Sequence, residues 1–217
     1  INYMTAAICS YFFIKSEISF NLILNAKWIY HAILIGTLFI VAFYFFAYGV
    51  QKVGISFTTV TNKMSFIIPV TAALILYPKD TLTTIKGAAF ILAIIGIFLS
   101  STKGKKLSFN KKYLWIILLI FFSQGIADAI FSDFEQRYPQ EDKYIFYMIL
   151  FGMATISGML ILIIKSIRVS NKLQLKSLFW GVVFGIPNFF SLVFFIKALG
   201  EINNSVVFSL TSMGIVI

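Results

Sequence analysis

The sequence is poor in the residues that build disulfides and metal sites. It holds 1 cysteine and 1 histidine among 217 residues. A lone Cys9 cannot form an internal disulfide, and a single histidine leaves no Cys/His cluster with the spacing of a metal site. The sequence therefore predicts neither a disulfide nor a bound metal, and no cofactor is expected.

Charged residues are also scarce. They make up 12 % of the chain against 59 % hydrophobic residues, and the mean hydropathy is +0.92. This composition excludes a water-soluble globule. The 18 basic residues outnumber the 8 acidic ones, but they lie between apolar blocks instead of alternating with aromatic residues on a polar face. Nucleic acid is therefore not an expected partner.

Apolar residues gather in blocks of about 20, long enough as helices to cross a hydrocarbon layer of roughly 30 Å. The blocks are unbroken, whereas the strands of a membrane β-barrel alternate apolar and polar residues, so a barrel is excluded. The sequence predicts an all-α, multi-pass integral membrane protein. Its six complete spans are expected at residues 29–50, 55–77, 82–100, 113–134, 144–165 and 178–199.

Each end of the chain is a shorter apolar segment. Residues 1–14 and 204–217 would each reach only about 21 Å as helix, less than a full crossing. The chain also begins at Ile1 without the basic region and cleavage site of a signal peptide. We expect both end spans to be truncated, so that about eight helices of a longer protein are present.

Basic residues in the connections indicate an orientation. Residues 101–112 contain five lysines and no acid, residues 165–176 contain four basic residues, and residues 133–143 contain four acids. By the positive-inside rule the first two connections are cytoplasmic. The expected location is the inner membrane of a bacterium.

The chain resembles itself at a shift of 149 residues, which places residues 1–68 on 150–217 without a gap. Spans then fall on spans and short turns on short turns, and a few positions are identical, among them the pair Gly36 and Gly185. This register predicts two incomplete five-helix repeats, 1–101 and 113–217. An odd number of spans inverts the second repeat, and inverted repeats are a transporter architecture that holds the substrate near the membrane midplane.

Several stretches are similar to a known transporter family. They are Val60–Pro69, Tyr77–Asp80, Gly87–Gly96, Gly185–Ser191, Lys197–Leu199 and Ser205–Phe208. Together they resemble the ten-helix, EamA-like branch of the drug/metabolite transporter superfamily. One departure is the turn Lys79-Asp80, where the family often has Gly-Glu. The resemblance implies export or import of a small metabolite by alternating access.

A polar residue inside a span is costly in hydrocarbon and is therefore a candidate site residue. In the span 55–77, Thr58, Thr61, Asn62 and Ser65 recur at helical spacing and predict one polar stripe. Lys63 lies beside the stripe, about 12 Å from the start of the helix. A cation at this depth suits a carboxylate or phosphate of a substrate. Alternatively, Lys63 pairs with an acid or extends to the interface.

The span 113–134 carries a second stripe, which consists of Gln124, Asp128, Ser132 and Glu135. Asp128 lies about 9 Å from the outer end and is the one acid well inside a predicted span. It is a candidate proton-coupling group, since a carboxyl group at this depth can exchange a proton with water on one side at a time. The alternative is that it neutralises Lys63.

The span 178–199 offers Gly181, Gly185 and Asn188 at helical spacing, with Pro187 before the asparagine. Small residues at this spacing favour a seam where helices pack. The carbonyl that Pro187 frees would instead allow a broken helix of the kind found in transporter sites. Lys197, close to the end of the span, is interpreted as reaching the interface.

In the last segment, Thr211 and Ser212 correspond to Asn62 and Lys63 under the repeat shift. They predict that hydroxyl groups line the side of the substrate site opposite the Lys63 cation. The predicted substrate-binding residues are Thr58, Asn62, Lys63, Gln124, Asn188, Thr211 and Ser212, with Asp128 as the proton-coupling residue.

The function expected from these features is secondary transport of a small polar metabolite, such as an amino acid, a nucleotide-sugar-like compound or another organic solute. A multidrug efflux carrier and a non-transporting membrane scaffold are the alternatives. A channel would need a filter or a ring of like residues, and an enzyme would need a nucleophile–base or metal constellation. Neither pattern is present in the sequence. A small molecule and the lipid bilayer are the expected partners, and a homodimer is compatible with the sequence.

Overall fold

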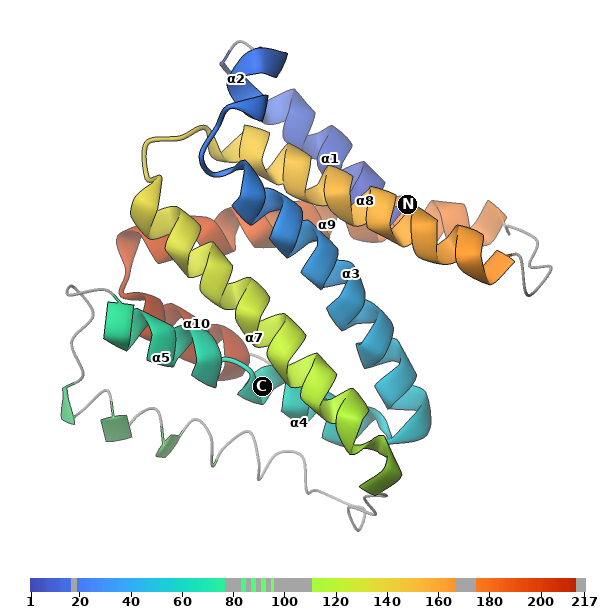
Figure 1. Ribbon diagram of the computed structural model, residues 1–217, viewed down its shortest axis with the longest axis vertical. Helices are drawn as coiled ribbons and strands as arrows, with labels where there is room; N and C mark the ends of the chain where they lie inside the picture. Colours follow the sequence, from blue (N-terminus) through green and yellow to red (C-terminus); the bar gives the residue numbers. More distant parts are fainter. Residues whose placement is uncertain are drawn as a thin grey trace. The chain divides into compact units, whose positions relative to one another are not determined.

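The computed structural model describes residues 1–16, 19–76, 83–84, 87–88, 91–92, 95, 111–166 and 175–213, and in these residues every regular element is a helix. Figure 1 shows them coloured along the chain. They are α1 (Asn2–Phe13), α2 (Phe20–Leu24), α3 (Ile29–Lys52), α4 (Ile55–Met64), α5 (Ile67–Leu76), the 3₁₀ turn η1 (Lys111–Tyr113), α7 (Leu114–Arg137), α8 (Lys143–Ser166), α9 (Leu175–Glu201) and α10 (Asn204–Met213).

Among the described residues, five segments are long and apolar enough to cross a membrane: α3, α4 together with α5, α7, α8 and α9. They coincide with five of the predicted spans. The prediction of an all-helical fold with several helices long and apolar enough to span a membrane is thus confirmed for the described residues. The predicted span 82–100 and the two predicted cytoplasmic connections lie largely outside the described residues. The short helix α2 was not predicted.

The span predicted at 55–77 consists of two helices, α4 and α5, separated by a turn at Ser65 and Phe66. Pro69 explains the turn because it has no N–H to donate to the carbonyl of Ser65, four residues earlier. That carbonyl accepts a hydrogen bond from the N–H of Ile68 instead, at 3.0 Å. The Ser65 hydroxyl also turns back and donates to the Asn62 carbonyl at 2.6 Å. The polar stripe therefore ends where the helix does.

The chain divides into two compact units. The first unit comprises Ile1–Ile40 and Gln136–Lys197, and the second comprises Val41–Glu135 and Ala198–Ile217. The boundary passes through α3, α7 and α9, so each unit is built from segments far apart in sequence.

In the first unit α1 and α8 pack against each other. Tyr3 at the start of α1 stacks on Phe151, with ring centroids 6.1 Å apart, whereas Phe13 at its end stacks on Tyr144, at 5.7 Å. Because Tyr144 lies nearer the start of α8 than Phe151, the two helices run antiparallel. Aromatic pairs of this kind add to the apolar packing.

Two glycines allow close helix crossings in the first unit. A Cβ atom on Gly36 of α3 would collide with the Leu150 carbonyl of α8 and would lie 3.1 Å from the Ala154 nitrogen. A Cβ atom on Gly185 of α9 would lie 2.5 Å from Thr5 Cβ and 2.8 Å from the Asn2 carbonyl oxygen of α1. Small residues permit such approaches between membrane helices. The packing interpretation of Gly185 is thus confirmed, and α9 continues through Pro187 without a break.

We expect Gly36→Ala to destabilise the protein by about 1–3 kcal/mol, because the added methyl group meets backbone atoms that cannot rotate away. Gly152→Ala on α8 is the matched control, since a Cβ atom there meets nothing within 4 Å. The control should be neutral or stabilising by up to about 1 kcal/mol, through helix propensity. Unfolding in mixed micelles measures both variants, and equal stability of the two would contradict the tight crossing.

In the second unit α10 lies beside α5 and also contacts α4 (Figure 1). Helix α7 packs on the junction of α4 and α5, where a Cβ atom on Gly125 would lie 2.8 Å from the Ser65 carbonyl oxygen and 2.9 Å from Ile68 Cβ. The absence of a side chain at Gly125 therefore brings α7 against the end of α4. This contact turns the two polar stripes toward each other.

Candidate functional site

Three amide and carboxyl side chains form a chain of hydrogen bonds between α4 and α7. The Asn62 amide of α4 donates to Gln124 Oε1 of α7 in a long hydrogen bond of 3.5 Å. The Gln124 amide then donates to Asp128 Oδ1, one turn further along α7, at 3.1 Å. All three side chains are half-buried. The helical spacing in the sequence places each of these side chains on its helix, and Gly125 allows α7 to approach α4.

Lys63 completes this group, here called the polar network (Asn62, Lys63, Gln124 and Asp128). The Lys63 ammonium is half-buried and lies close enough to the Asp128 carboxylate for the two charges to interact. Within the described part of the chain the two groups make no direct ion pair. Opposite charges that share one site reduce the cost of placing either in a membrane interior. The structure therefore brings together the predicted cation and the predicted acid.

The α7 stripe continues beyond the polar network. Ser132 accepts a hydrogen bond from the side-chain amide of Asn204, the first residue of α10, and both side chains are buried. Glu135 is also buried, one turn further on. The sequence does not single out Asn204, because its pattern predicts a short turn at this position, where asparagine is common. Its polar partner on another helix is visible only once α7 and α10 are in place.

The other predicted site residues do not join the polar network. The Thr58 hydroxyl donates to the Gly54 carbonyl at 2.8 Å, and the Thr211 hydroxyl donates to the Val207 carbonyl at 2.9 Å. Both hydroxyls thus bond to their own helix, as threonine often does. Thr58 and Ser212 are buried, and Thr211 is exposed. Among the described residues, no hydrogen bond links these three side chains to the network.

Asn188 belongs to the first unit, whereas the polar network lies in the second. Its side-chain amide donates to Asn2 Oδ1 of α1 at 3.1 Å. This bond lies next to the crossing at Gly185, and interhelical amide bonds of this kind stabilise membrane helix pairs. The contacts of Asn188 therefore favour a packing role.

We expect Gln124→Met to destabilise the second unit by about 1–2 kcal/mol, because it removes both hydrogen bonds of Gln124 and leaves Asn62 and Asp128 without that partner. Gln136→Met, on the same helix, is the control because no other described residue holds its side chain by a hydrogen bond. Unfolding in mixed micelles compares the two. Equal losses of unfolding free energy in the two variants would mean that the hydrogen bonds of the polar network do not stabilise the protein beyond local packing.

Comparison with known proteins finds a relative in Haemophilus influenzae, described as an uncharacterized protein. It is 26 % identical over 223 residues, which cover 99 % of this chain and 74 % of the relative. No family model matches the chain. No solved structure matches it either. The relative's description names no activity, so the chemistry of the site is the starting point for a function.

Proposed function

We propose that the chain is a secondary carrier of the drug/metabolite type, which moves a small polar solute across the inner membrane of a bacterium by alternating access. The observation that carries the proposal is the polar network, set between helices that are otherwise apolar. Charged and amide side chains are costly at this depth and are typical of substrate and ion pathways. A packing role alone would require neither Lys63 nor Asp128.

The helix bounds support an internal repeat. A shift of 149 residues carries the first residue of α4, Ile55, onto the first residue of α10, Asn204. The same shift carries the last residue of α3, Lys52, onto the last residue of α9, Glu201. Helix ends are set by local turns and caps, so matching ends are independent of the few identical residues. They favour the two five-helix repeats predicted from the sequence.

The glycine crossings support an inverted relation between the repeats. The shift carries Gly36 onto Gly185 and Thr5 onto Ala154. Gly36 packs on Ala154, and Gly185 packs on Thr5, so each repeat supplies the glycine of one crossing and the partner of the other. A two-fold axis between the repeats predicts that the glycine and its partner swap repeats from one crossing to the other. Inverted repeats of this kind surround a central substrate site in many carriers.

The polar network offers a simple chemistry for coupled transport. Lys63 can bind a carboxylate or phosphate of the solute, and the amides of Asn62 and Gln124 can orient it by hydrogen bonds. An anion at Lys63 competes with the Asp128 carboxylate. Protonation of Asp128 removes this competitor, so proton binding and anion binding favour each other by linkage. The network therefore suits proton-coupled movement of an anionic or zwitterionic metabolite, without a catalytic residue.

Substrate counterflow tests the proposal. The full-length protein is reconstituted in liposomes that are preloaded with an unlabelled amino acid, sugar phosphate, nucleotide sugar or cationic dye, and entry of the same labelled compound is followed. We expect accelerated entry for at least one anionic or zwitterionic compound. Accelerated entry of cationic dyes alone would favour the multidrug alternative. No accelerated entry for any compound would favour a membrane scaffold.

A further inference from the structure

Three members of the polar network, Asn62, Gln124 and Asp128, are here called the amide relay, and their hydrogen bonds all point one way. Asn62 donates to Gln124 Oε1 at 3.5 Å, and Gln124 donates to Asp128 Oδ1 at 3.1 Å. In the described part of the chain, these three side chains make no other hydrogen bond. An ionised carboxylate can only accept hydrogen bonds, so the charge of Asp128 fixes the direction of both amides.

Protonation of Asp128 favours the opposite direction. A carboxyl group that takes up a proton from water gains an O–H donor, and this donor needs an acceptor in surroundings that are otherwise apolar. Gln124 can supply the acceptor, because Oδ1 already contacts its amide group, whereas Oδ2 has no hydrogen-bond partner among the described residues. When the Gln124 amide turns over, its Oε1 accepts from the Oδ1 hydroxyl and its N–H groups face Asn62.

The same reversal changes what Asn62 offers to a solute. While Asp128 is ionised, Asn62 uses one N–H group to bind Gln124 and leaves its oxygen Oδ1 without a described partner. In the reversed relay Oδ1 accepts from Gln124, so both N–H groups of Asn62 are available. A carboxylate or phosphate binds to N–H donors and is repelled by a carbonyl oxygen. The half-buried Asn62 side chain therefore matches an anion in the reversed relay.

We infer that Asn62 is a proton-dependent specificity residue, which binds an anionic solute through its N–H groups when Asp128 is protonated. The inference rests on the proposed function, in which Lys63 binds the anion and Asp128 binds the coupling proton. It adds a second route of coupling to the loss of charge competition at Lys63. Asn62 makes no hydrogen bond to Asp128 itself, so Gln124 is the positioning residue that transmits the change.

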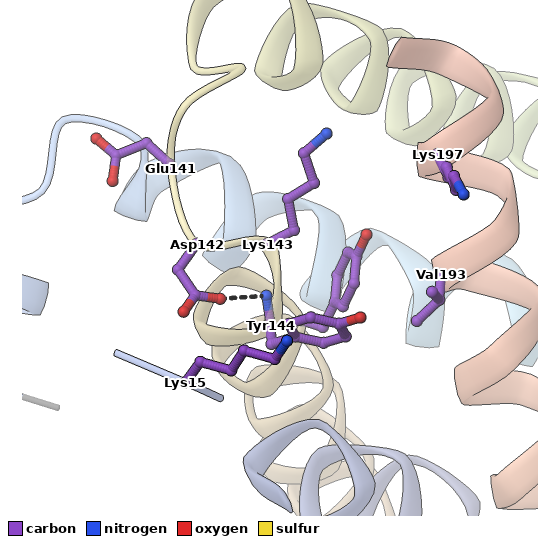
Figure 2. Close-up of a pocket in the computed structure, with 8 residues that line it drawn as sticks. Lys15, Glu141, Asp142, Lys143, Tyr144, Val193 and Lys197 are labelled. Atoms are coloured by element: carbon purple, nitrogen blue, oxygen red, sulfur yellow. Dashed lines mark hydrogen bonds between the residues drawn. The ribbon is translucent and has the colours of Figure 1, made fainter. Parts of the chain in front are cut away.

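Asp142 in the first unit shows why an amide partner matters. Its Oδ1 accepts from the Tyr144 backbone N–H at 2.9 Å (Figure 2). A backbone N–H group cannot turn over to become an acceptor, so protonation of Asp142 cannot pass to a further residue through this bond. Asp142 lines a cavity of about 380 Å³ whose walls also contain three lysines: Lys15, Lys143 and Lys197. Lys197, interpreted from the sequence as reaching the interface, thus lies in the wall of this cavity.

Few ionisable residues of the second unit lie on the described helices around Asp128. They are Lys63 on α4, Tyr44, Tyr48 and Lys52 on α3, and Asp133 and Glu135 on α7, whereas α5 and α10 carry none. The Lys52 ammonium lies over the Tyr48 ring, and this ring is 6.3 Å from that of Trp115, about 20 Å along α7 from Asp128. Tyr44, Asp133 and Glu135 therefore remain to be distinguished from Asp128 by experiment.

NMR of the side-chain amide groups tests the relay directly. The purified full-length chain is labelled with ¹⁵N and studied in a neutral detergent. The Asn62 and Gln124 signals, assigned from Asn62→Leu and Gln124→Met, are followed as the pH falls. We expect both signals to shift with one common midpoint, because one proton reverses both hydrogen bonds. The Asn188 signal is the internal control and should not follow this midpoint, since its amide donates to Asn2.

Two variants distinguish the relay from a simple charge effect. In Asp128→Asn neither signal should shift. In Gln124→Met the Asn62 signal should no longer shift, whereas a charge on Asp128 that acts through space would still move it. A shift that persists in Gln124→Met therefore contradicts the relay. If Gln124→Met does not fold, different midpoints for Asn62 and Gln124 in the wild type contradict the relay in the same way.

Three further variants exclude other ionisable groups as the source of the shift. Tyr44→Phe, Asp133→Asn and Glu135→Gln each remove one such group near the relay. Each variant should retain the common shift of the two amide signals. Loss of the shift in any of them would assign the titration to that residue and contradict the relay.

Counterflow extends the test to solute binding. KM for labelled glutamate and for labelled inorganic phosphate is measured on the acid and on the alkaline side of the NMR midpoint. We expect Asn62→Leu to raise KM about tenfold on the acid side and less than about threefold on the alkaline side, since the protonated relay offers the N–H donors. Gln51→Leu replaces an exposed amide outside the network and should match the wild type. Equal effects of Asn62→Leu on both sides contradict the inference.

The two readouts separate failure of the inference from failure of the proposed function. If the wild type transports an anion but its Asn62 signal is independent of pH, the relay is wrong and the transport function stands. If the amide signals titrate together but the wild type transports neither anion, the relay stands, and the proposed anion site and the specificity role of Asn62 are wrong.

Discussion

Replacing Lys63 by Met is expected to reduce counterflow of anionic solutes by about 10- to 100-fold, because it removes the cation of the polar network while preserving side-chain length. A hydrogen bond to a charged group contributes roughly 1.5–3 kcal/mol, which corresponds to this range. Counterflow in liposomes at saturating and low solute concentrations is the measurement. The loss should be largest at low concentration, since Lys63 acts in binding.

Lys52→Met is the matched control for Lys63→Met. Lys52 is exposed at the end of α3, where its ammonium lies 5.9 Å from the centre of the Tyr48 ring. It has the same charge but lies outside the polar network, so uptake by this variant should stay within about twofold of the wild type. If Lys63→Met transports anionic solutes as well as Lys52→Met does, Lys63 is not part of the substrate site.

Replacing Asp128 by Asn should leave solute exchange largely intact but abolish accumulation driven by a pH gradient. The reason is that asparagine retains an oxygen to accept the hydrogen bond from Gln124 but cannot take up and release a proton. Exchange and gradient-driven uptake are measured on the same proteoliposomes. Asp133→Asn, on the same helix, is the control and should still accumulate solute. Accumulation by Asp128→Asn would exclude the coupling role.

The double variant Lys63→Met, Asp128→Asn tests whether these two charges stabilise each other in the folded protein. Each single variant leaves one charge in the membrane interior without the other, so each should lower stability by about 1–3 kcal/mol. The double variant should lose less unfolding free energy than the two single variants lose in total, because neither charge remains. Additive losses in unfolding experiments would mean that Lys63 and Asp128 do not interact in the folded protein.

Most of the helical spans could be predicted because hydropathy and length are local properties of a sequence. The division of the span 55–77 at Ser65 was within reach too, since Pro69 removes one backbone hydrogen bond four residues earlier. The pairing of Asn62 with Gln124 could be predicted only in part. Helical spacing groups each residue with others on its own helix, but it does not say which helix faces which.

The sequence by itself determined that this protein is helical and apolar enough to span a membrane several times. Backbone groups without hydrogen bonds are costly in lipid, so a long apolar segment there forms a helix, which pairs its own backbone groups. Only the tertiary structure decided which polar groups meet. Asn62 reaches Gln124 because Gly125 lets α7 approach α4, and Lys15, Lys143 and Lys197 line one cavity because the segment after α1, the start of α8 and the last turns of α9 lie together. Such encounters depend on packing between segments more than 50 residues apart in the chain, which no local pattern records.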